Sequence, residues 1–122
     1  MNRRMFAALA VALTAILASV SAQEVFTSKD QGVTLPSVVR SVKAGYTAAA
    51  MDARIEGMAI LEAVVLADGK VGDVTVTQSL DKEYGLDTQA VESVKQWLFK
   101  PGTKDGKAVA VRVTIEIRFT LK

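Results

Sequence analysis

The chain has 122 residues, enough for one domain, and contains neither cysteine nor histidine. These absences exclude disulfides, thiol catalysis and the commonest transition-metal ligands. Fifteen basic residues stand against thirteen acidic ones, and two of the basic residues, Arg3 and Arg4, precede the first apolar run. The rest of the chain is formally neutral, so its charge does not indicate a nucleic-acid partner.

The first segment has the pattern of a secretory signal. Met5–Val20 contains only two polar residues and follows the basic pair. Val20-Ser21-Ala22 offers the small side chains that signal peptidase requires, so we expect residues 1–22 to be a signal peptide cleaved after Ala22. The alternative is a short uncleaved anchor. Its helix would span about 24 Å of a hydrocarbon core about 30 Å thick, which a tilted or thinned bilayer accepts.

Two short elements are predicted before the long strands. Residues 23–32 are polar and lack a period, which predicts a short flexible leader. Residues 33–44 partly alternate between apolar and polar side chains and include Pro36, which is typical of a short edge strand or an extended arm. The alanine-rich run 47–54 favours a helix with Thr47 as its N-cap.

Residues 55–66 form the first long predicted strand. Because they are apolar on both sides for much of their length, we expect this strand in the middle of a sheet. Asp68-Gly69 then predicts a two-residue hairpin turn. Residues 71–79 follow as a second strand, in which Val71 is out of phase and the adjacent Gly72 indicates a bulge.

A second helix is predicted to begin with Asp87 as its N-cap. Apolar residues then recur at helical spacing on one face, namely Ala90, Val91, Val94, Trp97 and Leu98. Lys100 precedes Pro101, which disfavours further helix. Asp105-Gly106 turns the chain into its last strand.

The last strand has a strict period of two. The apolar positions are Val111, Val113, Ile115, Ile117, Phe119 and Leu121, and the positions between them are Arg112, Thr114, Glu116, Arg118 and Thr120. The element order predicts an α+β fold, a two-layer sandwich in which a three-stranded antiparallel sheet carries two helices on one face. With the first long strand in the centre, the last strand offers an edge to an extended partner. The arm or a second copy of the domain could equally cover that edge.

Other candidate sites in the sequence have ordinary structural explanations. Trp97 is expected in the core rather than as a stacking platform. Asp81, Glu83 and Asp87 lack the spacing of a calcium loop, so we expect a solvated loop and no metal. Glu56 and Glu62 are too far apart along one strand to act as a catalytic pair. We therefore expect a protein that is not an enzyme and that needs no cofactor.

The residues of the presumed domain resemble the C-terminal domain of the TonB family over residues 33–122. The resemblance depends on an ordered set: Gly57, Asp68-Gly69, Leu86-Asp87 with Ala90, Trp97-x-Phe99-x-Pro101, Asp105-Gly106 and Phe119-x-Leu121. It implies a periplasmic domain that couples a proton-driven motor of the inner membrane to transporters of the outer membrane. It also implies that the transporter's N-terminal segment adds as a strand beside the last strand. The implied pairing residues are Arg112, Thr114, Glu116, Arg118 and Thr120.

The sequence departs from the family pattern in three places. The Pro-x-Tyr-Pro element is represented by Ala44-Gly45-Tyr46-Thr47, without either proline. The expected cleavable signal stands where a full-length transducer has a membrane-spanning anchor with a motor-contacting polar face, and a short leader stands where it has a long proline-rich spacer. An alternative function is therefore a structural envelope protein that uses the fold for self-association, as a homodimer, or for cell-wall attachment. An uncleaved signal would hold the domain at the periplasmic side of the inner membrane.

Overall fold

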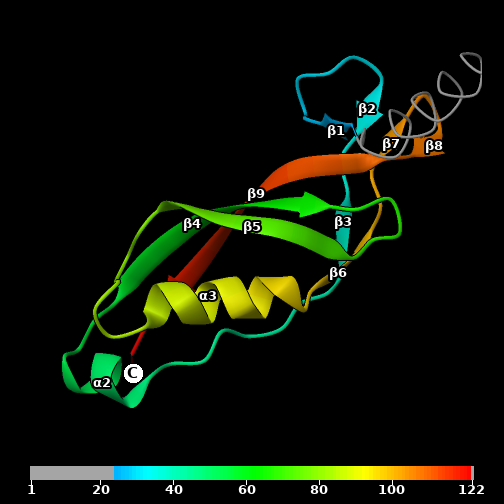
Figure 1. Ribbon diagram of the computed structural model, residues 1–122. Coiled ribbons are helices and arrows are strands. Elements are labelled where there is room, and N and C mark those ends of the chain that lie inside the picture. Colours follow the sequence, from blue (N-terminus) through cyan, green and yellow to red (C-terminus); the bar gives the residue numbers. More distant parts are fainter. Residues whose placement is uncertain (1–23, 122) are drawn as a thin grey trace, which may run out of the picture.

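The computed structural model of the protein describes residues 24–121 (Figure 1). The expected signal peptide or anchor at residues 1–22 lies outside the described residues. Within residues 24–121, neither helix has the length and hydropathy needed to span a bilayer.

Three long antiparallel strands organise the fold. Strand β4 (Gly57–Val65) lies between β5 (Val71–Gln78) and β9 (Ala110–Phe119). All nine residues of β4 have a partner on β9, from Gly57 opposite Phe119 to Val65 opposite Val111. The predicted central position of the first long strand is confirmed, and so is the bulge beside Gly72, where β5 carries an extra residue between Val71 and Val74.

Both helices lie on one face of this sheet (Figure 1). Helix α3 (Leu86–Lys95) packs along it, and the short helix α2 (Ala48–Asp52) follows the N-cap Thr47, whose hydroxyl accepts a hydrogen bond from the Ala50 amide at 3.1 Å. The core joins the helices to alternate residues of β4 and β9; its members include Ala50, Ala59, Leu61, Ala63, Val65, Leu86, Ala90, Val94, Ile115, Ile117 and Phe119. The α+β two-layer prediction is confirmed.

Six short strands complete the structure. Strand β1 (Val25–Phe26) runs parallel to the beginning of β9, so the main sheet has four strands, in the order β1-β9-β4-β5, and not the three antiparallel strands that were predicted. The remaining short strands pair as β2 (Val33–Thr34) with β7 (Thr103–Lys104), β7 with β8 (Lys107–Ala108), and β3 (Ser37–Arg40) with β6 (Leu98–Lys100). The sequence did not predict β1, because two residues are too few to show a period.

The two Asp-Gly turns differ in length. Leu66 and Lys70 are joined by a backbone hydrogen bond of 2.8 Å and enclose three residues, so the predicted two-residue turn at Asp68-Gly69 is wrong by one residue. Gly69 has a φ of +88°, and a Cβ at this position would lie 2.1 Å from the Phe99 carbonyl oxygen. The second turn, Asp105-Gly106, joins β7 to β8 as a two-residue hairpin.

The predicted N-cap of α3 is wrong. The cap residue is Gly85, which has no side chain, and Asp87 lies inside the first turn of the helix. The Asp87 carboxylate accepts hydrogen bonds from the amides of Leu80 at 2.9 Å and Asp81 at 3.0 Å, and the Ser79 hydroxyl also donates to it. Asp81 in turn accepts the Leu86 amide at 3.1 Å. The two carboxylates therefore fold the loop onto the helix.

Helix α3 also ends earlier than its apolar pattern predicts. It stops at Lys95, and Trp97 and Leu98 lie beyond it. The Phe99 amide donates to the Gly69 carbonyl at 2.9 Å, so the chain leaves the helix to contact the β4–β5 hairpin. This tertiary hydrogen bond has no signature in the local sequence.

Asp87 generates a prediction about stability. We expect Asp87→Ala to lower the free energy of unfolding by about 1–3 kcal/mol at neutral pH, because amide donors lose their acceptor in a buried loop. Asp73→Ala, at an exposed position, should change it by less than about 0.5 kcal/mol. Urea titration of both variants measures the difference, and equal effects would contradict the role given to Asp87.

The same group predicts a pH dependence. Burial raises the pKa of Asp87, but hydrogen bonds from Asp81, Ser79 and Leu80 outweigh it, and the folded pKa lies below 3.8. Because the folded pKa is the lower one, this stabilisation is present above pH 3.8 and is lost as pH falls through the folded value. Wild type should therefore lose more stability on acidification below pH 4 than Asp87→Asn does, as measured by thermal melts across that range.

Candidate docking groove beside the last strand

The two edges of β9 are used differently. One edge is paired with β4 along its length, from Val111 to Phe119. The other edge carries β1 at Ala110 and Val111 only. Within residues 24–121, no strand is paired with this outer edge from Arg112 to Phe119. A stretch of about eight residues therefore presents backbone groups that a further strand could bind.

The residues predicted for the site lie together on one face. The side chains of Arg112, Thr114, Glu116, Arg118 and Thr120 are all exposed. In the sheet register Arg112 lies opposite Val64 and Arg118 opposite Met58, on the face that the helices leave open. These side chains therefore flank the free edge and do not point into the core.

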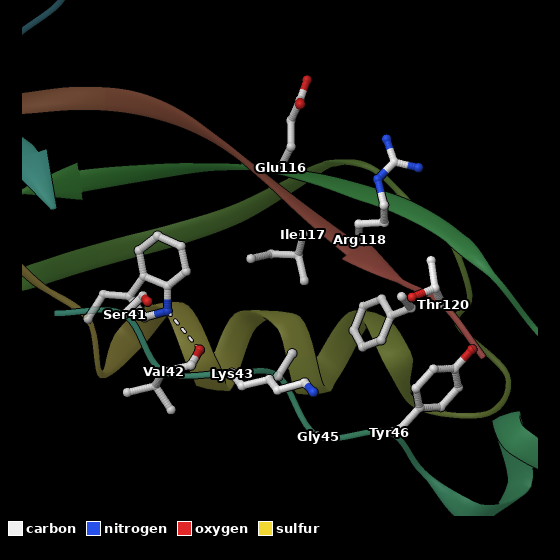
Figure 2. A pocket seen from close by; sticks show the side chains of 12 residues that line it. Ser41, Val42, Lys43, Gly45, Tyr46, Glu116, Ile117, Arg118 and Thr120 are labelled. Atoms are coloured by element: carbon white, nitrogen blue, oxygen red, sulfur yellow. Dashed lines mark hydrogen bonds between the residues drawn. The ribbon is translucent and has the colours of Figure 1, made fainter. Parts of the chain in front are cut away.

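The opposite wall of the edge is the chain that precedes α2. We call residues 35–46 the arm; they overlap the extended arm predicted at residues 33–44, include β3 and run beside β9 toward α2. Two adjoining hollows, of about 880 and 750 Å³, lie between the arm and β9 and share Trp97 and Glu116 in their walls. In Figure 2 Ile117 points toward the arm, and Glu116 and Arg118 point away from it. We call these two adjoining hollows together the groove.

Trp97 holds the arm in place at the middle of the groove. Its indole N–H donates to the Val42 carbonyl at 3.0 Å, shown as the dashed line in Figure 2. Its ring lies 6.1 Å from the ring of Phe99, which is buried. Trp97 is half-buried, so it packs against the core as expected and also forms part of a wall that the sequence did not predict.

Tyr46 closes the far end of the groove. Its ring meets that of Phe119 edge to face, with centroids 5.5 Å apart, and its hydroxyl donates to the Ile55 carbonyl. Burial, with a smaller contribution from Glu56, raises the pKa of the hydroxyl, which stays protonated and able to donate. Tyr46 therefore attaches the end of the arm both to Phe119 of the last strand and to Ile55, which precedes β4.

Gly102 allows the beginning of the arm, at Pro36, to pass close to the segment between β6 and β7. A Cβ at this position would lie 2.7 Å from the Thr34 carbonyl oxygen, 2.7 Å from Val111 Cγ2 and 3.1 Å from Pro36 Cδ. Only a residue without a side chain permits this close approach. The beginning of the arm is therefore held by backbone packing.

Sequence reasoning identified the free strand but not the groove. The exposed apolar side chains of the arm, Leu35 at 50% and Val38 at 52%, line the hollow that Trp97 and Phe99 also line. The sequence signal for this wall of the groove is the pair of apolar residues beside Pro36. That pair by itself does not show which surface its side chains face. The position of the arm results from the contacts of Trp97, Tyr46 and Gly102 together with the pairing of β3 and β6.

Comparison with known proteins places these features in a family. The family described as "Gram-negative bacterial TonB protein C-terminal" matches residues 42–121. The chain is similar to Protein tonB2 of Pseudomonas aeruginosa, with 38% identity over 76 residues, covering 62% of this chain and 28% of that protein. It is also similar to Protein TonB of Vibrio cholerae, with 35% identity over 103 residues, covering 84% of this chain and 42% of that protein.

A solved structure agrees with this assignment at the level of the fold. The solution NMR structure of the Pseudomonas aeruginosa TonB CTD superposes with a TM-score of 0.58 at 23% identity, covering 79% of this chain and 93% of that one. The chain spans less than half the length of these two curated relatives, 28% of one and 42% of the other.

The role of Trp97 in positioning the arm is testable. Trp97→Phe keeps a ring but removes the donor to Val42, so we expect the free energy of unfolding to fall by about 0.5–1.5 kcal/mol. Amide exchange of residues 41–46 should accelerate more than exchange within β4, as read by NMR. Unchanged exchange in this segment would show that the indole does not hold the arm.

Proposed function

Because this chain belongs to the TonB C-terminal family, we propose that it is an exported periplasmic domain that captures an extended segment of an envelope partner as an added strand. The observation that carries the proposal is the free outer edge of β9 from Arg112 to Phe119, which lies beside the groove. Main-chain groups on this edge would supply the hydrogen bonds. The proposal involves no catalytic chemistry and no cofactor.

A strand added at this edge would present its side chains alternately to two surfaces. One set would enter the groove among apolar side chains such as Val38, Trp97 and Ile117. The other set would lie on the open face of the sheet beside Arg112, Glu116 and Arg118. The partner segment that fits is therefore extended, apolar at every second position and complementary in charge at the others.

Apolar burial has to contribute to this binding. Each backbone hydrogen bond adds only about 0.5–1.5 kcal/mol net, whereas association costs about 4–15 kcal/mol in lost freedom. A short segment forms few such bonds, so side chains placed in the groove, at about 25 cal/mol per Å² of buried apolar area, would decide whether it stays bound. The preformed arm reduces the cost because it needs no ordering on binding.

The proposed partners are the N-terminal segments of outer-membrane transporters, or other envelope proteins, which would link this domain to transmembrane transport. Family membership and the free edge support this choice. An unpaired edge also accepts β9 of a second copy. A homodimer formed in this way would occupy the same surface and would serve the alternative role of a structural envelope protein.

NMR titration with N-terminal peptides of outer-membrane transporters tests the proposal. We expect amide shifts concentrated in residues 112–120 and in the arm at 35–46, with the helix α2 unaffected. Light scattering of the unliganded chain supplies the control for self-association. Shifts that avoid β9, or a concentration-dependent dimer that peptides do not dissociate, would contradict transporter capture.

The charges beside the edge predict a preference among peptides. The double variant Arg112→Glu with Arg118→Glu should weaken binding of an acidic peptide by about threefold to tenfold, since each exposed pair contributes up to about 1 kcal/mol. The matched control is Lys70→Glu with Lys107→Glu, two exposed positions outside the groove. Isothermal titration calorimetry measures both. Equal losses in the two double variants would show that net charge, and not position, matters.

A further inference from the structure

The outer edge of β9 already carries one strand of the chain itself. Val25 lies opposite Ala110 and Phe26 opposite Val111, in parallel orientation. This edge is the same one that the proposed function assigns to a partner, and the inference below rests on that function. We call residues 24–34 the clip. The clip precedes residues 42–121, which the family description matches.

The clip is attached to the domain by side-chain and backbone contacts beyond β1. The Lys104 ammonium lies 5.7 Å from the centroid of the Phe26 ring and donates to the Gln31 carbonyl. Strand β2 pairs with β7, with Val33 opposite Lys104. The β1–β9 pairing, the β2–β7 pairing and the Lys104 ammonium thus hold the residues on both sides of the turn between β1 and β2.

That turn carries the chain away from the edge immediately after Phe26. The Thr27 amide donates to the Asp30 carboxylate at 2.8 Å, and the Asp30 amide donates back to the Thr27 carbonyl at 3.1 Å. Ser28 then forms part of the wall of the hollow beside Arg112 and Thr114. The clip therefore ends where the groove begins.

We propose that the clip is the boundary of the docking edge, so that a partner strand is confined to Arg112–Phe119 and abuts the turn at Thr27–Ser28. Val25 and Phe26 then determine the register and the length of the segment that binds. A partner segment of about eight residues fills the available edge. Partner residues beyond these eight, at the end next to the clip, form no further pairing with β9.

Displacement of β1 by a longer partner segment would add little to the binding free energy of that segment. The partner would replace two residue pairs on β9 with two equivalent pairs, and the contact between Phe26 and Lys104 would be lost. The clip is also part of the same chain, so its effective concentration at the edge is on the order of millimolar or higher. An intermolecular competitor at micromolar concentration does not overcome this advantage.

A disulfide lock tests whether the boundary is present and compatible with binding. The full chain contains no cysteine, so Val25→Cys with Ala110→Cys introduces a single possible bridge between partner residues. We expect the bridge to form on mild oxidation in the absence of any peptide. The oxidised chain should bind an eight-residue transporter peptide within twofold of the wild type.

Peptide length tests the register. An eight-residue transporter peptide and the same peptide extended by two residues at the boundary end should bind the wild type equally. In Val25→Gly with Phe26→Gly, which weakens β1, the longer peptide should bind about fivefold to tenfold more tightly than the shorter one. The matched control is Glu24→Gly with Lys29→Gly, at exposed clip positions outside β1, and it should behave as the wild type.

Each outcome bears on the inference. Failure of the bridge to form, loss of peptide binding in the oxidised chain, or a preference for the longer peptide already in the wild type would each overturn the boundary while strand addition stands. Equal binding of both peptides to the glycine variant would overturn it as well. Absence of binding by either peptide to the wild type would contradict the proposed function itself.

Discussion

The pairing of β4 with β9 is the constraint on which the rest of the structure depends. All nine residues of β4 are matched to β9, and the alternation of β9 buries Ile115, Ile117 and Phe119 beneath the sheet. A register slip of one residue would bring Arg112 and Glu116 into the core, so the hydrophobic pattern strongly specifies the alignment. Once β9 is fixed on one side in this way, its other edge faces outward, and within residues 24–121 only β1 is paired with it.

An exposed strand edge can pair with unrelated chains, and three features of this domain limit such pairing. Charged side chains at Arg112, Glu116 and Arg118 border the free stretch and oppose indiscriminate pairing. Strand β1 covers the first two residues, and the arm stands opposite the remainder without hydrogen bonding to it as a strand. The arm is held by other parts of the chain, because Trp97 donates to its Val42 carbonyl and its Tyr46 hydroxyl donates to the Ile55 carbonyl.

The clip lies before the region that the family description matches, and the arm lies partly within it. The matched region begins at residue 42, within the arm, whereas β1, β2 and β3 all precede it. The Lys104 ammonium lies over the Phe26 ring, and the Thr34 carbonyl lies close to Gly102.

The sequence by itself determined the layers of this protein. Periods of two and 3.6 identified the long strands and α3, the alanine-rich run with Thr47 identified α2, and apolar residues on both sides of β4 identified the central strand. These signals work because each reports burial of a local segment. The tertiary structure alone decided the length of the Asp68-Gly69 turn, the end of α3 at Lys95, the anchoring role of Asp87 and the position of β1. The groove belongs with these, since Trp97 reaches Val42 across more than fifty residues of chain. Such contacts depend on where distant segments of the chain meet, and the periodicity of a local sequence does not indicate that position.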